Sequence, residues 1–387
     1  LKSLFKCLSL IKPLVMVFED IHWIDGDTSE FIRQMTVNTA KFTFAVIMLE
    51  RTDGARDPKT VLPFSKMIEL DKLGSGNIRS IVASVFRIHV GKVPTELAGI
   101  FSKITSGNPF FAEQLALYFR DNDMLDGEMK LKIPDLELPA GITSVVTARI
   151  DNLTSDIREI IKTASVLGTQ VNLDVLSAML NGKDLGRYTE ETVKEDIWYQ
   201  IDSILYMFRH VLIKDTAYGM ILKRKLRELH LAAAETIETG SRYSSKKYCY
   251  ELAEHFYRAE SYKKALKYAK ISSNKAKRNY SNVYFEKYLK RILDLIPLLK
   301  IPESRSYSLE KDTLLELEHF YYLTAEMQKR DEISRKLNSL YKRKKDPELK
   351  IDIHLIEYKL KVYKGKTAEA MKSAKKALRL ALDNGLE

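Results

Sequence analysis

Two adjacent carboxylates follow a short apolar run near the start of the chain. The run is Leu14–Phe18, and Glu19 and Asp20 come directly after it. Ligands of open α/β sheets bind beyond the carboxyl ends of the strands. There, one acid could hold Mg²⁺ through water, and the other could orient or deprotonate an attacking water. The alternative is a strand that merely ends in a solvated acidic turn.

An α/β layer is expected to position these acids. Leu14–Phe18 and residues 42–49 are short, β-branched runs that end at polar residues, as strands buried on both faces of a parallel sheet do. Residues 28–39 suit a crossover helix between them, and residues 67–70 suit a third strand. The repeated strand–helix spacing predicts the C-terminal part of an α/β sheet.

Helical periodicity dominates the rest of the chain. Helices are predicted at 77–88, Thr95–Thr105, Pro109–Asp121, Ile142–Asn152, Ser155–Leu167 and 173–180, a strand or wing at 201–214, and a basic helix at 217–238. From Tyr248 onward the pattern indicates antiparallel helix pairs with a Pro/Ser break at 301–308. The pair Ala265 and Ala269 recurs at Ala370 and Ala374, an interval that suggests repeats of about 34 residues.

The segment from Val15 to Asp25, which reads Val-Met-Val-Phe-Glu-Asp-Ile-His-Trp-Ile-Asp, resembles the Walker B region of STAND-class ATPases. The resemblance is to the branch found beside class III adenylyl cyclases, kinases and regulators. Three later motifs follow in that family's order: Met-Leu-Glu-Arg ending at Arg51, Gly-Asn-Pro ending at Pro109, and Phe-Arg-His-Val-Leu-Ile around His210. The resemblance covers roughly residues 1–300.

This resemblance implies a role for each matched residue, with ATP or ADP and Mg²⁺ as cofactors. Glu19 takes the magnesium-linked place, and Asp20 takes the water-orienting, catalytic place beside the ion. Arg51 matches the sensor arginine that reaches the γ-phosphate, and Pro109 packs near the nucleotide. His210 contacts the diphosphate in the closed, resting state, and a histidine that titrates near neutrality suits such a switch.

Two departures from the family pattern leave alternatives open. Glu50 stands where relatives carry a small or hydroxylated residue, and the alternative role for Arg51 is a local ion pair with Glu50. Val211 replaces the family's Asp after the histidine, and His210 is alternatively a core or capping residue.

The predicted fold class is mainly α. Residues 1–72 are the C-terminal part of a P-loop NTPase sheet, 73–138 a helical lid, 139–240 a winged-helix domain, and 241–387 a solenoid of tetratricopeptide-like (TPR-like) repeats. No Gly-x-x-x-x-Gly-Lys-Ser/Thr string occurs, and the nearest match, at Gly365, is predicted to be a turn. Because the chain starts at Leu1, we expect a fragment whose phosphate-binding loop lies upstream, with ATPase activity only in the full-length protein.

Composition limits the partners. Residues 241–387 hold 34 Lys and Arg against 20 Asp and Glu, although Lys mixed with Glu on helices is most often solvated surface. Cys7 and Cys249 fit neither a disulfide framework nor a zinc site, and no apolar run is long enough for a membrane span. We expect a reduced, cytoplasmic protein that binds a protein partner through its repeats and controls an upstream effector domain.

The leading hypothesis is therefore the regulatory switch module of a signal-transduction ATPase, with a nucleotide cyclase or kinase as its effector. One alternative is a non-enzymatic TPR scaffold with a degenerate ATPase part. The other is a winged-helix transcription regulator. The charge pattern argues against nucleic acid as a ligand, because residues 155–180, the expected recognition region, carry Asp156, Glu159 and Asp174 against Arg158 and Lys162.

Overall fold

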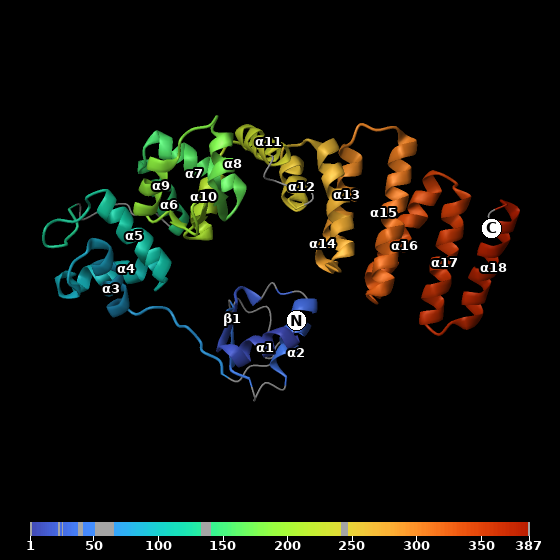
Figure 1. Ribbon diagram of the computed structural model, residues 1–387, viewed down its shortest axis with the longest axis horizontal. Coiled ribbons are helices and arrows are strands. Elements are labelled where there is room, and N and C mark those ends of the chain that lie inside the picture. The colour runs from blue at the N-terminus through green and yellow to red at the C-terminus, as the bar shows by residue number, and fades with distance from the viewer. Residues whose placement is uncertain are drawn as a thin grey trace. The chain divides into compact units, whose positions relative to one another are not determined.

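The computed structural model of the chain describes residues 2–21, 24, 26–37, 42–50, 66–132, 141–240 and 247–385. Helices dominate these ranges, and the strands form two small sheets (Figure 1). The predicted fold class, mainly α with a small α/β part and a helical solenoid, is confirmed. The chain divides into two compact units, Leu1–Lys72 and Leu73–Glu387. Every helix of the described part is too short or too polar to serve as a membrane span.

The first unit contains a pair of parallel strands with one helix before them and one between them. Its elements are α1 (Lys2–Ile11), β1 (Leu14–Phe18), α2 (Gly26–Thr36) and β2 (Phe44–Met48). The register runs from Leu14 opposite Phe44 to Phe18 opposite Met48. Both predicted strands and the helix that connects them are confirmed, with β2 shorter than expected.

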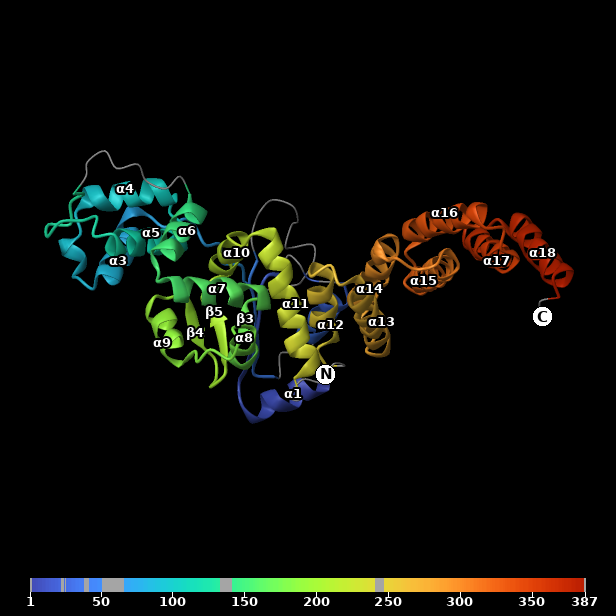
Figure 2. The ribbon, with the colours of Figure 1, turned by 90° about the horizontal axis from the view of Figure 1, so that it is seen from above.

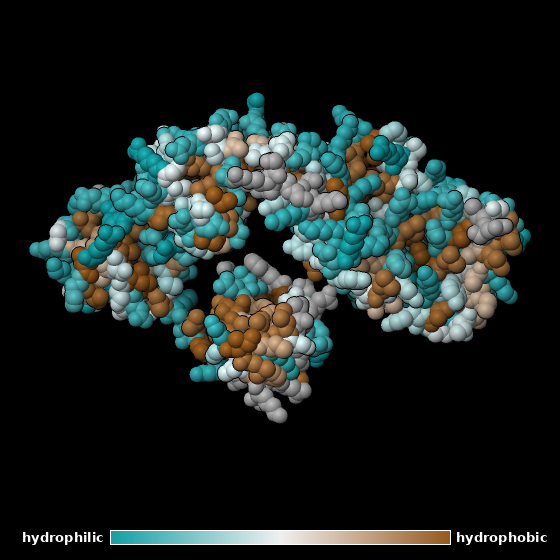
Figure 3. Space-filling model, viewed as in Figure 1, coloured by the Kyte–Doolittle hydropathy of each residue, from teal (hydrophilic) through white to brown (hydrophobic). Residues whose placement is uncertain are grey.

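Only one face of this sheet is covered within the described residues. Ile32 of α2 is fully buried, and the rings of Phe5 on α1 and Phe31 on α2 lie 6.4 Å apart. Along both strands exposed residues alternate with half-buried ones, so that Val15 is 59% and Ile47 46% exposed. The prediction of strands buried on both faces is wrong here. Figure 3 shows apolar residues gathered on the visible face of this unit.

The third strand predicted at 67–70 is also wrong. Residues 66–74 adopt no regular secondary structure. Ile68 is 71% and Leu70 90% exposed. An apolar, β-branched run needs a neighbouring strand and a covering layer to form part of a sheet, and no described element supplies either.

Four short helical segments open the second unit. They are α3 (Ser75–Phe86), the 3₁₀ turn η3 (Val90–Lys92), α4 (Thr95–Thr105) and α5 (Pro109–Asp121). The bounds of α4 and α5 are those predicted, and Gly74 is the N-cap of α3. Ile78, Leu115 and the edge-to-face pair Phe101–Phe119 form the core of this helical part.

The next part combines five helices with a three-stranded antiparallel sheet. Its elements are α6 (Ile142–Asn152), α7 (Ser155–Leu167), β3 (Gln170–Asn172), α8 (Leu173–Met179), α9 (Gly186–Lys194), β4 (Trp198–Gln200), β5 (Leu205–Phe208) and α10 (Val211–Gly219). The strand order is β3-β5-β4, so β4 and β5 form a hairpin and β5 is central. Ile161, Trp198 and Phe208 lie in its core.

Two predictions for this part need correction. The strand or wing expected at 201–214 is right only as far as β5, because α10 already begins at Val211. The basic helix expected at 217–238 is two helices, α10 and α11 (Lys223–Thr239), separated by a short turn. Helix α9 and strand β4 were not predicted.

Successive antiparallel helices make up the remainder. They are α12 (Cys249–Arg258), α13 (Tyr262–Arg278), α14 (Asn282–Leu295) with the 3₁₀ turn η4 (Ile296–Leu298), α15 (Glu303–Leu323), α16 (Met327–Arg343), α17 (Pro347–Tyr363) and α18 (Thr367–Asp383). Each helix packs against the next, and α11 joins this array to α7 and α8 (Figure 2). We refer to α12–α18 as the repeat array.

The repeat array is less regular than the sequence pattern suggests. Ala265, Ala269 and Ala370 are buried between helices, whereas Ala374 is only half-buried. The break predicted at 301–308 is shorter, since α15 begins at Glu303. The turn predicted at Gly365 is confirmed, and its φ of 71° explains why glycine suits it. The helices also differ in length, so the array does not follow a strict repeat.

Candidate functional site

The acidic strand end lies in the first unit, at the carboxyl edge of its parallel sheet. Glu19 and Asp20 are both exposed directly after β1. The backbone holds this edge together, because the amide of Leu49 donates to the carbonyl of Phe18 (2.8 Å) and the amide of Ile21 donates to the carbonyl of Leu49 (3.1 Å). The carboxylates therefore stand where parallel sheets bind ligands.

Asp20 also has a special backbone conformation. Its φ is 54°, in the left-handed region that most residues avoid and that Asp tolerates better than others. The chain thus turns sharply at the second acid. Two adjacent exposed carboxylates suit Mg²⁺, which is commonly held by one or two carboxylates together with phosphate oxygens. The matched residues Arg51, His22, Trp23 and Asp25 lie outside the described residues.

Pro109 and His210, both in the second unit, mark two helix starts that meet. Pro109 is exposed in the first turn of α5, where the side chain of Asn108 accepts from the amide of Phe111 at 3.0 Å. His210 is the N-cap residue of α10 by its backbone position, but the alternative of a capping side chain is not borne out. Its side chain caps nothing.

The His210 ring packs on the first turns of α5. Its centroid lies 3.9 Å from that of Phe110, and its Nε2 lies 3.9 Å from Oε2 of Glu113. Partial burial, assisted by the nearby guanidinium of Arg209, lowers the pKa of His210 below its ordinary value of 6.5. A neutral imidazole at neutral pH can both donate and accept a hydrogen bond. The structure thus brings together the helix of Pro109 and His210, while Glu19 and Asp20 belong to the other unit.

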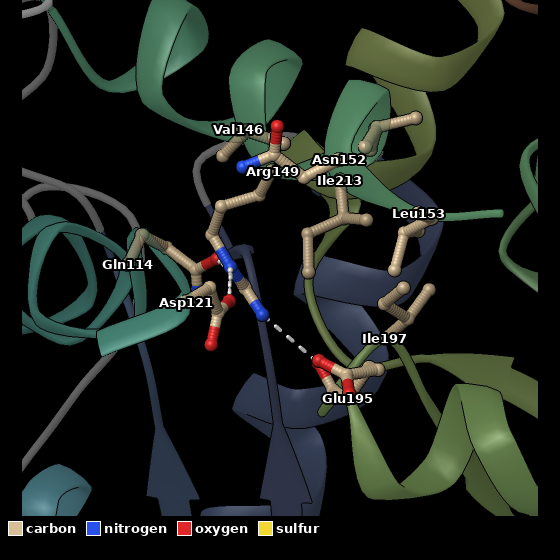
Figure 4. A pocket seen from close by; sticks show the side chains of 10 residues that line it. Gln114, Asp121, Val146, Arg149, Asn152, Leu153, Glu195, Ile197 and Ile213 are labelled. Atoms are coloured by element: carbon tan, nitrogen blue, oxygen red, sulfur yellow. Dashed lines mark hydrogen bonds and ion pairs between the residues drawn. The ribbon is translucent and has the colours of Figure 1, made fainter. Parts of the chain in front are cut away.

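A buried arginine that contacts α5, the helix that begins at Pro109, was not predicted from the sequence. Arg149 of α6 is 8% exposed, and its guanidinium donates to Oε1 of Gln114 on α5, to the carbonyl of Glu195 (3.1 Å) and, at a long 3.5 Å, to Asp121 (Figure 4). Burial lowers the pKa of Arg149, although Asp121 opposes this shift. Three segments that are distant in sequence therefore meet on one guanidinium, which we call the Arg149 joint.

A cavity of about 290 Å³ borders the Arg149 joint. Its apolar wall includes Val146 of α6, Ile197 directly before β4, and Ile213 of α10 (Figure 4). Gln114 lines the other side, and its Nε2 is buried without a hydrogen-bond partner among the described residues. A joint with an unsatisfied amide beside a cavity is loosely packed.

One sequence signal could have revealed Arg149. Val145, Val146, Arg149 and Ile150 follow helical spacing, so the arginine falls on the apolar stripe of α6. A charge on such a stripe must find partners when it is buried. The identity of those partners, which lie on other segments, is not readable from the stripe.

The described residues form no larger cluster of metal ligands around the magnesium site predicted at Glu19 and Asp20. Among the residues that the structure describes, no group of three or more His, Cys, Asp or Glu side chains could hold a metal ion. The assignments of Glu19, Asp20, Arg51, Pro109 and His210 to nucleotide and magnesium remain predictions.

Comparisons with known proteins give matches of limited extent. No protein-family model matches the chain. An uncharacterised protein of Rhizobium meliloti (strain 1021) is 24% identical over an alignment of 302 residues, and the match covers 73% of this chain and 28% of that protein. The chain thus spans little more than a quarter of this curated relative.

A solved structure also matches. It is that of a Signal Transduction ATPase with Numerous Domains (STAND) protein with a tetratricopeptide repeat sensor from Pyrococcus horikoshii. The match has 12% sequence identity and a TM-score of 0.42, and it covers 95% of this chain and 56% of that one. At these values neither match establishes a function for this chain.

Proposed function

We propose that this chain is the regulatory portion of an ATP-driven signalling switch of the STAND class. The observation that carries the proposal is the parallel strand β1, whose carboxyl end presents Glu19 and Asp20 at the ligand-binding edge of a sheet. The order of the later motifs supports it. The proposal includes a cytoplasmic location and an effector elsewhere in the protein, such as a nucleotide cyclase or kinase.

In our proposal each of the two acids has a different role at this edge of the sheet. Glu19 would hold Mg²⁺, directly or through water, and Asp20 would accept a hydrogen bond from the attacking water and orient it. Mg²⁺ supplies charge neutralisation at the phosphates when it is bound. The backbone turns at Asp20, whose φ is 54°, directly after Glu19. Hydrolysis of this kind is slow and serves timing rather than turnover.

The second unit would sense the nucleotide state. In our proposal Pro109 begins the lid helix α5, and His210 begins α10 of a winged-helix domain whose sheet order is β3-β5-β4. A neutral His210 packed on Phe110 can donate to a diphosphate oxygen. Loss of that contact would free the lid from the winged helix, and the repeat array would bind the protein partner that triggers this change.

A role in reading DNA is less favoured. The helix that directly precedes the β4–β5 hairpin is α9, and not the region 155–180 that the sequence suggested. Its nine residues carry Arg187 and Lys194 against Glu190 and Glu191, so it has no net charge. A helix that enters a groove of DNA needs cationic side chains for the phosphates. A non-enzymatic scaffold remains the second candidate, favoured by the size of the repeat array.

The test is the substitution Asp20→Asn in the full-length protein. We expect ATP turnover to fall by about 10²-fold or more, with nucleotide affinity retained, because a water-orienting carboxylate acts on the chemical step. Phosphate release and binding of a fluorescent ATP analogue measure the two. The matched control is Glu30→Gln on α2, an exposed acid of the same unit that pairs with Arg33.

Turnover that Asp20→Asn leaves at the level of the control would overturn the catalytic assignment. A full-length protein without any ATP turnover before substitution would favour the scaffold.

A further inference from the structure

A second hollow lies in the repeat array, between α13 and the segment that leads into α15. Its volume is about 570 Å³, within the range of roughly 300–1,000 Å³ typical of ligand sites. The floor is aliphatic: Leu299 is buried, and Leu266, Ile301 and Leu309 are half-buried. Among the described residues that line it, none is aromatic. We call this hollow the α13–α15 groove.

Four basic side chains stand around this floor. Lys263 and Lys270 project from one face of α13, Lys300 belongs to the connecting segment, and Arg305 lies in the first turn of α15. All four are exposed. The one acid among the described lining residues is Asp312, which accepts a hydrogen bond from Ser308. The rim therefore carries a net charge of about +3.

These cations differ from their neighbours in having no acidic partner. Lys264 pairs with Glu238 at 2.8 Å, and Lys311 pairs with Asp346 at 3.2 Å. None of the four rim cations forms an ion pair with a described residue. Like charges gathered around an apolar floor repel one another, and an anion with an apolar part would relieve that repulsion.

We propose that the α13–α15 groove binds an acidic segment of a partner protein. The carboxylates of the segment meet the four rim cations, and an aliphatic side chain of the segment fills the floor beside Leu266 and Leu309. The inference rests on the proposed role of the repeat array as the partner-binding part, and it names the class of partner.

A protein segment fits this groove better than a nucleic acid does. Proteins that hold single-stranded nucleic acids combine cations with aromatic rings on which the bases stack. The floor here is aliphatic, which suits leucine or isoleucine side chains. Helical repeat arrays also present elongated surfaces to peptide segments.

The probe is a short fluorescein-labelled peptide of Glu, Asp and Leu, titrated into the chain without nucleotide while anisotropy is recorded. Two matched peptides replace either the acids by Gln and Asn or the leucines by Ser, and a labelled oligouridine of similar length represents RNA. We expect the acidic, leucine-containing peptide to bind most tightly, and its affinity to fall as salt screens the rim.

The decisive variant is Lys263→Glu/Lys270→Glu, which reverses two rim charges on exposed positions. We expect this double variant to lower the affinity for the acidic, leucine-containing peptide about tenfold or more. The control is Lys372→Glu/Lys376→Glu on α18, which makes the same change of net charge with exposed lysines that lie outside the groove. It should leave the affinity within about twofold. A leucine-free peptide should also bind more weakly.

Equal weakening by both double variants would show that net charge alone attracts the peptide, and would overturn the proposal. Tighter binding of oligouridine than of the acidic peptide would overturn it in favour of nucleic acid. Circular dichroism of each variant establishes that the helices are intact. Because the titration contains no nucleotide, its failure leaves the ATPase proposal untouched, and the Asp20→Asn test decides that proposal separately.

Discussion

Two buried arginines each join neighbouring helices, and they differ in how completely their charge is paired with an acidic side chain. Arg330 of α16 is 0% exposed, donates through Nε and Nη2 to Glu318 of α15, and lies 4.7 Å from the ring centroid of Tyr322. Arg149 reaches its acid, Asp121, at only 3.5 Å and borders a cavity of about 290 Å³.

The difference separates a fixed joint from one that can change. The charge of Arg330 is paired with that of Glu318, which is also buried. Separating α15 from α16 would therefore leave each of these charges without its partner. The partners of Arg149 are the side-chain amide of Gln114, the backbone carbonyl of Glu195 and, at the long distance of 3.5 Å, a carboxylate. A cavity lies beside them. A joint of the second kind can therefore rearrange more easily than a joint of the first.

The largest expected effect comes from breaking the closed joint. Glu318→Ala leaves the Arg330 guanidinium buried without its acid, which costs about 3–5 kcal/mol of stability. Chemical denaturation followed by circular dichroism, with hydrogen exchange of α15 and α16, measures the loss. The control is Glu332→Ala, which removes an exposed acid from its pair with Lys336 and should cost less than about 1 kcal/mol. Equal losses would show that Arg330 is not held by Glu318.

A third joint, which links α10, α11 and α12, is a chain of polar side chains with the buried His230 and His255 among its members. Arg258 donates to the hydroxyl of Tyr218 (2.7 Å), which lies 2.9 Å from Nε2 of His230, whose Nδ1 lies 2.9 Å from Nδ1 of His255. Since the guanidinium only donates, the tyrosine hydroxyl keeps its own proton, and we assign that proton to the hydrogen bond with Nε2 of His230. This order assigns the Nδ1 proton to His230 and leaves Nδ1 of His255 as an acceptor.

That chain of hydrogen bonds works only when both histidines are neutral. Burial, with the neighbouring positive groups, lowers the pKa of His230 to about 3, and burial lowers that of His255 to about 4. In the unfolded chain both protonate as pH falls below about 6.5. The unfolded state therefore binds more protons, and the free energy of unfolding declines as pH falls from 6.5 towards the folded pKa values.

We expect this acid sensitivity to reach on the order of 3 kcal/mol for His230 at pH 4. Urea unfolding at a series of pH values measures it. His230→Asn/His255→Asn should flatten the pH dependence in this window, whereas His319→Asn, at an exposed position of α15, should leave it unchanged. An unaltered slope in the double variant would contradict the assigned chain of neutral histidines.

Sequence periodicity predicted the helices whose apolar stripes are complete. Thr95–Thr105 and Pro109–Asp121 have the predicted bounds because each carries a periodic core face and clear end signals. Helix α9 was missed because its buried residues are two threonines, Thr189 and Thr192, which give no apolar stripe. Its position depends on the strands and helices around it, and not on its own pattern.

The candidate site divides in the same way. The acids Glu19 and Asp20 could be found because strand, turn and carboxylates are contiguous, and the exposed edge that the structure gives them follows from the strand alone. The partners of Arg149 could not be found in this way, because they lie 28 to 46 residues away along the chain. Contacts that join distant segments depend on packing, which local pattern does not encode.

The smallest expected effect tests whether the Arg149 joint is the weaker one. Arg149→Met keeps the apolar stem but removes every N–H donor, and we expect a loss of about 1–3 kcal/mol because Gln114 and the carbonyl of Glu195 lose their partner. The matched control is Arg120→Ala, which removes a more exposed arginine from the same Asp121.

Hydrogen exchange distinguishes the joints in this last case. In Arg149→Met the amides of α5, α6 and β4 should exchange about tenfold faster, while those of α15 and α16 keep their rates. In Arg120→Ala all of these rates should stay within about twofold, since exposed ion pairs contribute little. If Arg149→Met instead accelerates exchange in α15 and α16 equally, the two joints unfold together, and the distinction between a fixed and a changeable joint fails.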